Sequence, residues 1–159
     1  MISGSKDKTI VVSDIVTRQH EATLDALTGC LSALAVNGRT LLSTGLDYTI
    51  GVWALGTWSH LRVVRVSEHV PDALYCTCLS VSGSMLVCGG WCEDEESGFM
   101  AVLDSDSMDC QHTLRLDHYV ESLLSVRGEV WGRLRDGKVV VWSKAERGEG
   151  SGMSEAARA

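Results

Sequence analysis

"DKTIVVSD" at residues 7–14, "DYTIGVW" at 47–53 and "DGKVVVW" at 136–142 are three versions of one short pattern in a chain of 159 residues. Each version opens with an aspartate in a turn-forming context and continues into a short apolar run. In the second version the apolar side chains alternate, so that Ile50 and Val52 are predicted on the same side of an extended segment. A polar turn followed by such alternation predicts a β-strand.

The same pattern recurs with a period of 40–45 residues. "MISGSKDKTIVVS" from Met1 matches "LLSTGLDYTIGVW" from Leu41, and related runs begin at Met85 and Val130. Between these runs, short Val- and Leu-rich segments alternate with Gly, Ser, Asp and Asn, as in "LSALAV" followed by "NGRT". Such punctuation every eight to twelve residues or so predicts an all-β protein. A period that holds four short strands is typical of a propeller blade.

These residues give the chain a resemblance to the WD40 repeat family. The resemblance rests on "SGSKDKTIVVSD", "STGLDYTIGVW" and "RDGKVVVW". Blades of that family carry an Asp in the turn before a strand that ends in Trp. Asp7, Asp47 and Asp136 match the Asp, and Trp53 and Trp142 match the Trp. The resemblance implies that these residues brace their blades.

The family also has a His before the inner strand of each blade, and His69 and His118 match it. With Asp136 and Trp142, His118 forms the nearest match to the polar bracing set of the family. Other positions depart from the pattern: Ser13 and Leu103 replace the Trp, and Thr28 stands at the His position of the second unit. In the third unit the turn has grown into "GGWCEDEESG" and has no Asp in register.

Counting strands predicts an open, incomplete propeller of about three and a half four-stranded blades over residues 1–143. The repeat units lie near 1–40, 41–84, 85–129 and 130–143. The first unit lacks its inner strand, and the last lacks its outer strand. We expect residues 144–159 to be a flexible tail, because "KAERGEGSG" and "MSEAARA" lack an alternating apolar pattern. The count favours a piece of a longer propeller, with further blades elsewhere; a four-bladed closure or assembly with a partner chain are the alternatives.

Composition narrows the class of protein. A hydrophobic share of 45 % and a charged share of 22 % are those of an ordinary globular domain. A net charge of −7 argues against nucleic-acid binding, which needs clustered Lys and Arg. No apolar stretch is long enough for a membrane helix, and the N-terminus does not resemble a signal peptide. We therefore expect a cytoplasmic protein, with the nucleus left open.

The six cysteines are predicted to be free thiols, because nothing indicates secretion. Cys76 and Cys78 lie two apart in a predicted strand, so both should face one side of the sheet. Their spacing does not match paired zinc knuckles, and "DSDSMD" at 104–109 lacks the Gly and Glu of a calcium loop. Cys92, next to the acidic run, is predicted to be exposed and open to modification. No metal or cofactor is expected.

No catalytic motif is evident, and the five histidines are scattered. We expect a non-catalytic scaffold that binds protein or peptide partners through loops on one rim of the propeller. The acidic run beside Trp91 suggests a contact with a basic partner. The alternative is the regulatory or substrate-recruiting portion of a larger enzyme, such as a ubiquitin ligase subunit or a kinase. The candidate contact residues are Lys6, Lys8, Tyr48, Trp91, Glu93, Asp94, Arg133 and Arg135.

Overall fold

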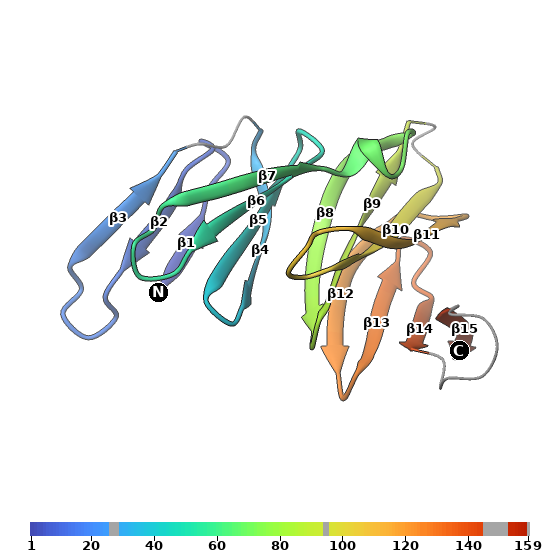
Figure 1. The fold of residues 1–159 in the computed structure, drawn as a ribbon. Helices are drawn as coiled ribbons and strands as arrows, with labels where there is room; N and C mark the ends of the chain where they lie inside the picture. Colours follow the sequence, from blue (N-terminus) through green and yellow to red (C-terminus); the bar gives the residue numbers. More distant parts are fainter. Residues whose placement is uncertain (26–28, 94–95, 145–152, 159) are drawn as a thin grey trace.

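The computed structural model describes residues 1–25, 29–93, 96–144 and 153–158, which form four antiparallel sheets (Figure 1). We number the sheets blades 1 to 4 in chain order. In each blade the strands pair with their neighbours in sequence. Blade 1 comprises β1 (Ile2–Gly4), β2 (Ile10–Ser13) and β3 (His20–Leu24), and blade 2 comprises β4 (Leu31–Asn37), β5 (Thr40–Gly45), β6 (Thr49–Ala54) and β7 (His60–Arg65).

Blades 3 and 4 each have four strands. Blade 3 comprises β8 (Ala73–Ser82), β9 (Met85–Cys92), β10 (Gly98–Asp104) and β11 (Cys110–Leu116). Blade 4 comprises β12 (Val120–Val126), β13 (Glu129–Leu134), β14 (Val139–Lys144) and β15 (Met153–Arg158). One turn of 3-10 helix, η1 (Val66–Glu68), connects blades 2 and 3.

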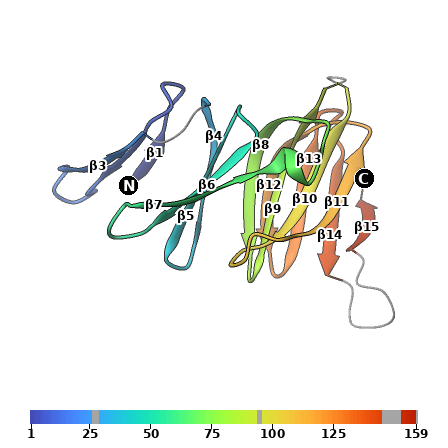
Figure 2. The ribbon, with the colours of Figure 1, turned by 45° about the horizontal axis from the view of Figure 1, so that its top comes forward.

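The blades follow one another from the N-terminal to the C-terminal end of the chain and do not close into a ring (Figures 1 and 2). β8 contacts both β4 and β12, so the inner strands of blades 2 to 4 lie side by side, and β1 of blade 1 contacts β4. Blade 1 has no inner strand ahead of β1 among the described residues, as the repeat pattern predicted. The prediction of an all-β, incomplete propeller is confirmed.

The prediction for the C-terminal tail is wrong for residues 153–158. β15 pairs with β14 in antiparallel register from Lys144–Met153 to Val139–Arg158, and thereby supplies the outer strand of blade 4. The outer strand of a blade needs little apolar pattern, because it faces solvent: β7 is exposed at five of its six positions. A small, polar segment such as "MSEAAR" therefore suffices. Residues 145–152 and 159 lie outside the described part of the chain.

Three hydrophobic clusters lie between successive blades. Ile10 and Leu24 of blade 1 pack with Leu41 and Trp53 of blade 2. Leu42, the neighbour of Leu41, belongs instead to the cluster shared by blades 2 and 3. Consecutive residues of a strand face opposite sides, so the central blades are buried on both faces. Each fully buried large side chain stabilises the fold by about 1.5–3 kcal/mol, and stacking of blades is what buries it.

Two predictions for the cysteines are also wrong. Cys76 and Cys78 face opposite blades, because the pairing of β8 with β9 shifts by one residue between them. Such a β-bulge reverses the side to which the following residues point. Cys76 lies in the cluster between blades 2 and 3, and Cys78 in the one between blades 3 and 4. Cys92 ends β9 with its side chain in the core, fully buried rather than exposed. All six cysteines are free thiols.

The turns that follow β1, β5 and β13, in blades 1, 2 and 4, share one geometry. Asp7 Oδ1 accepts a hydrogen bond from the Thr9 amide at 3.0 Å, and Asp136 Oδ1 accepts one from the Lys138 amide at 3.0 Å. Asp47 does the same toward the amide two residues on, at 3.3 Å. Hydrogen bonds from the Thr9 hydroxyl and amide lower the pKa of the Asp7 carboxyl. These turns explain why an aspartate marks each repeat.

Candidate functional site

The polar residues that the repeat pattern singled out are divided between blades 2 and 4. In blade 2 the buried Trp53 donates its indole N–H to Ser43 Oγ at 2.9 Å. In blade 4 the position of Ser43 is taken by Gly132, and Trp142 Nε1 is buried without a hydrogen-bond partner among the described residues. Conversely, His118 Nε2 lies 3.6 Å from Asp136 Oδ2 in blade 4. Each blade therefore carries a different part of the bracing set.

The other predicted bracing positions give no comparable network. Thr28, at the His position of blade 2, lies outside the described residues. The His69 ring has no hydrogen bond or ion pair to a described residue; the backbone amide of His69 closes the 3-10 turn on Val66 O at 3.0 Å. In blade 3, Leu103 fills the Trp position and is fully buried. Apolar packing therefore holds this blade against blade 2.

Four aromatic rings form a row across blades 2 to 4. They lie on the rim that is formed by the turns after the second strands and by the loops before the inner strands. Tyr48 and Tyr75 stack with centroids 6.4 Å apart. Tyr75 meets Trp91 edge-on at 6.1 Å, and Trp91 stacks on Tyr119 at 4.2 Å with the ring planes 27° apart. We call these residues the aromatic row. Each ring comes from a different turn or strand end, so the row exists only once the blades have stacked.

Arg135 fixes the blade 4 end of the aromatic row. Its guanidinium carbon lies 5.3 Å from the centroid of the Tyr119 ring, and Nη1 donates to the Tyr119 hydroxyl. The Arg135 amide also donates to Tyr119 O at 3.1 Å. On the other side, Gly98 lets the Tyr119 backbone approach closely, because a Cβ at Gly98 would lie 2.3 Å from Tyr119 Cα. Cation–π and hydrogen-bond contacts thus hold Tyr119 flat under Trp91.

Tyr48 has an unusual backbone conformation. Its φ is 63°, in the left-handed region that favours glycine, and the equivalent residue of blade 4 is Gly137 with φ 87°. A left-handed conformation costs a non-glycine residue about 1–2 kcal/mol. Five other described non-glycine residues also have a positive φ, and four of them lie away from this rim. Lys8 shares the conformation in blade 1, with φ 75°, but is exposed and lies outside the row.

The other predicted contact residues are distributed around the row. Lys6 is exposed in the blade 1 turn, and Glu93 is exposed at the end of β9, where its amide donates to Asp72 O at 3.0 Å. Arg133 pairs with Glu121 at 2.7 Å on the terminal face of blade 4 and is not part of the row. Asp94 and Glu95 lie outside the described residues. The row therefore brings together Tyr48, Trp91 and Arg135 from the predicted set.

The rim around the aromatic row is acidic. In the described parts of the turns 46–48, 66–72, 93–97, 117–119 and 135–138, seven carboxylates accompany only two Lys or Arg side chains. Both basic residues are engaged, Arg135 on Tyr119 and Lys138 on Asp136 at 2.7 Å. Arg115 of β11 also reaches these turns, where it pairs with Asp72, so carboxylates outnumber cationic side chains around the aromatic row without being the only charges there. The seven are Asp47, Glu68, Asp72, Glu93, Glu96, Asp117 and Asp136.

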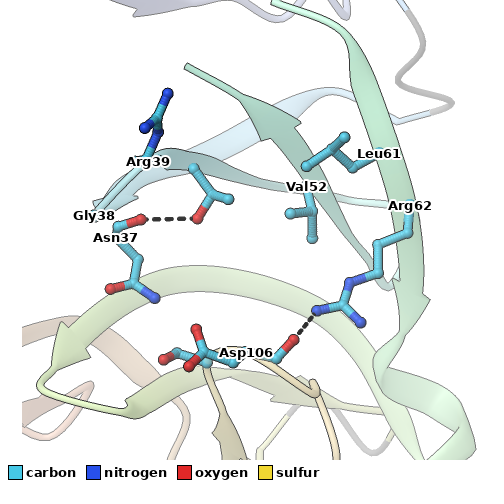
Figure 3. Close-up of a pocket in the computed structure, with 9 residues that line it drawn as sticks. Asn37, Gly38, Arg39, Val52, Leu61, Arg62 and Asp106 are labelled. Atoms are coloured by element: carbon cyan, nitrogen blue, oxygen red, sulfur yellow. Dashed lines mark hydrogen bonds between the residues drawn. The ribbon is translucent and has the colours of Figure 1, made fainter.

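The opposite rim has a hollow of about 540 Å³ between blades 2 and 3. Figure 3 shows Arg62 of β7 reaching across it to the backbone of Asp106. Arg62 also donates to Ser107 O at 3.0 Å, so its guanidinium ties blade 2 to a turn of blade 3. That turn, the "DSDSMD" segment, is closed by Asp104 Oδ1, which accepts from the amides of Asp106 and Ser107. Arg62 and the acidic segment 104–109 therefore have a structural role on this rim.

Two members of the aromatic row, Tyr75 and Tyr119, were not anticipated from the sequence. Tyr119 directly follows His118, so the repeat register places it on the same rim as the turn aspartates. Tyr75 lies just after a shift in the pairing of β8 with β9 between Ala73 and Tyr75, which the sequence pattern does not reveal. A search for aromatic residues at rim positions of the repeat would have found Tyr119 and not Tyr75.

No described helix is long and apolar enough to cross a membrane. Within the same residues, no group of three or more His, Cys, Asp or Glu side chains is arranged to hold a metal ion.

Comparison with known proteins places the fold. No protein-family profile matches the sequence, and no curated protein matches it. Among solved structures, the chain is similar to the computationally designed Ika4 protein, with 26 % identity, a TM-score of 0.67 and coverage of 89 % of this chain and 83 % of that one. It is also similar to a chain in a crystal structure of the Mitotic Checkpoint Complex, with 18 % identity and a TM-score of 0.78. That match covers 98 % of this chain but 47 % of the other, so the present chain spans about half its length.

The fold and the rim together define the class of protein. The chain is an open segment of a β-propeller with four stacked antiparallel sheets. One of its rims presents an aromatic row among carboxylates.

Proposed function

We propose that the chain is a non-catalytic protein-interaction module of WD40 type, which binds a basic segment of a protein partner along the aromatic row. The observation that carries the proposal is the row itself: four aromatic rings contact one another in succession across three blades. Tyr48, Tyr75 and Trp91 are partly exposed, and the buried Tyr119 supports Trp91 from below. Interfaces are enriched in Tyr and Trp, which provide large rigid contact areas.

The charge of the rim selects the chemistry of the partner. Lys and Arg side chains bind favourably over Tyr and Trp faces, and carboxylates beside the rings strengthen the attraction. Glu93 and Asp117 are exposed next to the row, whereas Asp72 is paired with Arg115. An extended peptide with spaced Lys or Arg residues satisfies both features. The similarity to a chain from a multi-protein complex supports a role in assembly. Six free thiols favour the reducing cytoplasm as its location.

Binding can be tested with a fluorescein-labelled peptide of Lys, Arg, Gly and Ser, and a second peptide in which Glu replaces the basic residues. We expect saturable binding of the basic peptide only, weakened by salt. Trp91→Ala should weaken it at least about tenfold. Trp58→Ala, which removes a partly buried tryptophan away from the row, should leave affinity unchanged. Equal binding of both peptides, or equal affinity of Trp91→Ala and the parent chain, would overturn the proposal.

A further inference from the structure

The two ends of the arc differ in chemistry. The terminal face of blade 4 carries Leu124, which is 62 % exposed, and Val126, which is 40 % exposed. Trp131 lies directly opposite Leu124 in the strand register and so shares its face. We call Leu124, Val126 and Trp131 the end patch. In blades 2 and 3 the residues that correspond to Trp131 are Leu42 and Val87, and both are fully buried against the next blade. Leu124 and Val126 take the places that Ala35 and Asn37 have in blade 2, so the end patch is bulkier and more apolar than that equivalent face. Glu129 borders the patch and accepts a hydrogen bond from Trp131 Nε1 at 3.1 Å.

The terminal face of blade 1 is polar. Its residues are Ser3, Val11 and Thr23, which lie opposite one another in the register of β1, β2 and β3. Ser13, on the same face, occupies the position at which Trp53 and Trp142 enter the interface with the preceding blade. A head-to-tail contact between copies would therefore set apolar side chains against hydroxyls. This end of the chain does not complement the end patch.

The side-chain hydrogen bonds that join the inner strands of neighbouring blades also change at blade 4. In blade 2, Ser32 Oγ donates to Cys76 O of blade 3 at 2.6 Å. In blade 3, the equivalent Thr77 Oγ1 donates to Val120 O of blade 4 at 2.8 Å. The next residue in this series is Glu121, which sits at the same bulge of its inner strand. An ionised carboxylate cannot donate to a carbonyl, so a further blade in the ordinary arrangement would face a repulsive contact here.

Glu121 instead pairs with Arg133 of its own blade at 2.7 Å. This pair borders the end patch and leaves that edge of the face without net charge. Two end patches related by a two-fold axis place apolar side chains against apolar side chains, with the Glu121–Arg133 pair of each copy beside them. A two-fold contact is also the commonest arrangement in homo-oligomers.

We propose that the terminal face of blade 4 is a dimer interface, occupied by the same face of a second copy of this chain. This interface is separate from the aromatic row, which stays on the rim of each copy. Four strands about 4.8 Å apart and about 20 Å long offer roughly 400 Å² of sheet per copy, or about 800 Å² in total. This area is below that of specific stable interfaces, so the dimer should be weak and in rapid exchange with monomer.

Sedimentation equilibrium between about 1 and 300 µM, a range suited to a small interface, tests this proposal. We expect a monomer–dimer equilibrium for the parent chain and a shift to monomer of at least tenfold in Kd for Leu124→Lys. Val11→Lys, the matched change on the blade 1 face, should dimerise normally. Circular dichroism must show that both variants fold.

The charge pair gives a second, independent arm. Glu121→Arg alone should weaken the dimer, because two guanidinium groups then meet at each edge, and adding Arg133→Glu should restore it. A monomer throughout the concentration range overturns the proposal. Dissociation by Val11→Lys, or growth into larger assemblies, indicates a head-to-tail contact and also overturns it.

Discussion

Blade 2 and blade 4 are the two most regular copies of the repeat, and they retain different parts of its polar set. Blade 2 has the buried bond from Trp53 to Ser43, at 2.9 Å. Blade 4 has the approach of His118 to Asp136, at 3.6 Å, and an indole N–H of Trp142 without a partner. Both blades are complete four-stranded sheets. Neither part of the set is therefore indispensable, because stacking of apolar faces supplies most of the stability.

The same two blades differ in the turn that reaches the rim. Blade 4 uses Gly137 at the left-handed position, and blade 2 uses Tyr48. Gly137 suits folding, whereas Tyr48 stands in a disfavoured conformation and begins the aromatic row. Stability and recognition are thus divided between equivalent positions of one repeat.

The largest difference between the blades is expected for the two buried tryptophans. Trp53→Phe should destabilise the chain by about 2–3 kcal/mol, because it leaves a cavity and removes the bond to Ser43. Trp142→Phe should cost about 1 kcal/mol less, because it also removes an unpaired buried donor. Urea unfolding of both variants measures the difference. Equal losses would show that the two indole N–H groups have equivalent surroundings.

A smaller effect should follow from removing the acceptor alone. Ser43→Ala leaves Trp53 Nε1 buried without a partner and should cost about 1–2 kcal/mol. Ser122→Ala, at an exposed position of blade 4, should stay within about 0.5 kcal/mol of the parent chain. Equal shifts of the urea midpoint for the two substitutions would show that the hydrogen bond from Trp53 to Ser43 does not stabilise blade 2.

The smallest effect concerns the exposed turn of blade 4 and its dependence on pH. Hydrogen bonds from Lys138 lower the pKa of the Asp136 carboxyl below its usual 3.8. A lowered folded-state pKa contributes stability above the unfolded value, which is lost as the pH falls through the folded value. The melting temperature of Asp136→Asn should therefore fall less than that of the parent chain below about pH 4. Parallel curves of melting temperature against pH for the two proteins would show that Asp136 does not contribute to this pH dependence.

Much of this architecture follows from the sequence. The period places the strands, and Asp7, Asp47 and Asp136 mark turns that share one geometry. Three features could not be predicted from the sequence, each for a physical reason. β15 is an outer strand, which needs no apolar pattern to pair. The bulge between Cys76 and Cys78 reverses a face that simple alternation assigns. The aromatic row depends on loops from three blades meeting in space, so single positions such as Trp91 could be predicted but their stacking could not.

The central claim is that rim position 48 holds an aromatic ring for binding at the expense of backbone strain. Tyr48→Gly and Tyr48→Ala both remove the ring, but only the alanine keeps a side chain in the left-handed conformation. We predict that both variants bind the basic peptide about five- to tenfold more weakly than the parent chain. The glycine variant should be the more stable of the two by about 1 kcal/mol. Unchanged peptide affinity in both variants, measured beside their urea unfolding, would contradict the claim.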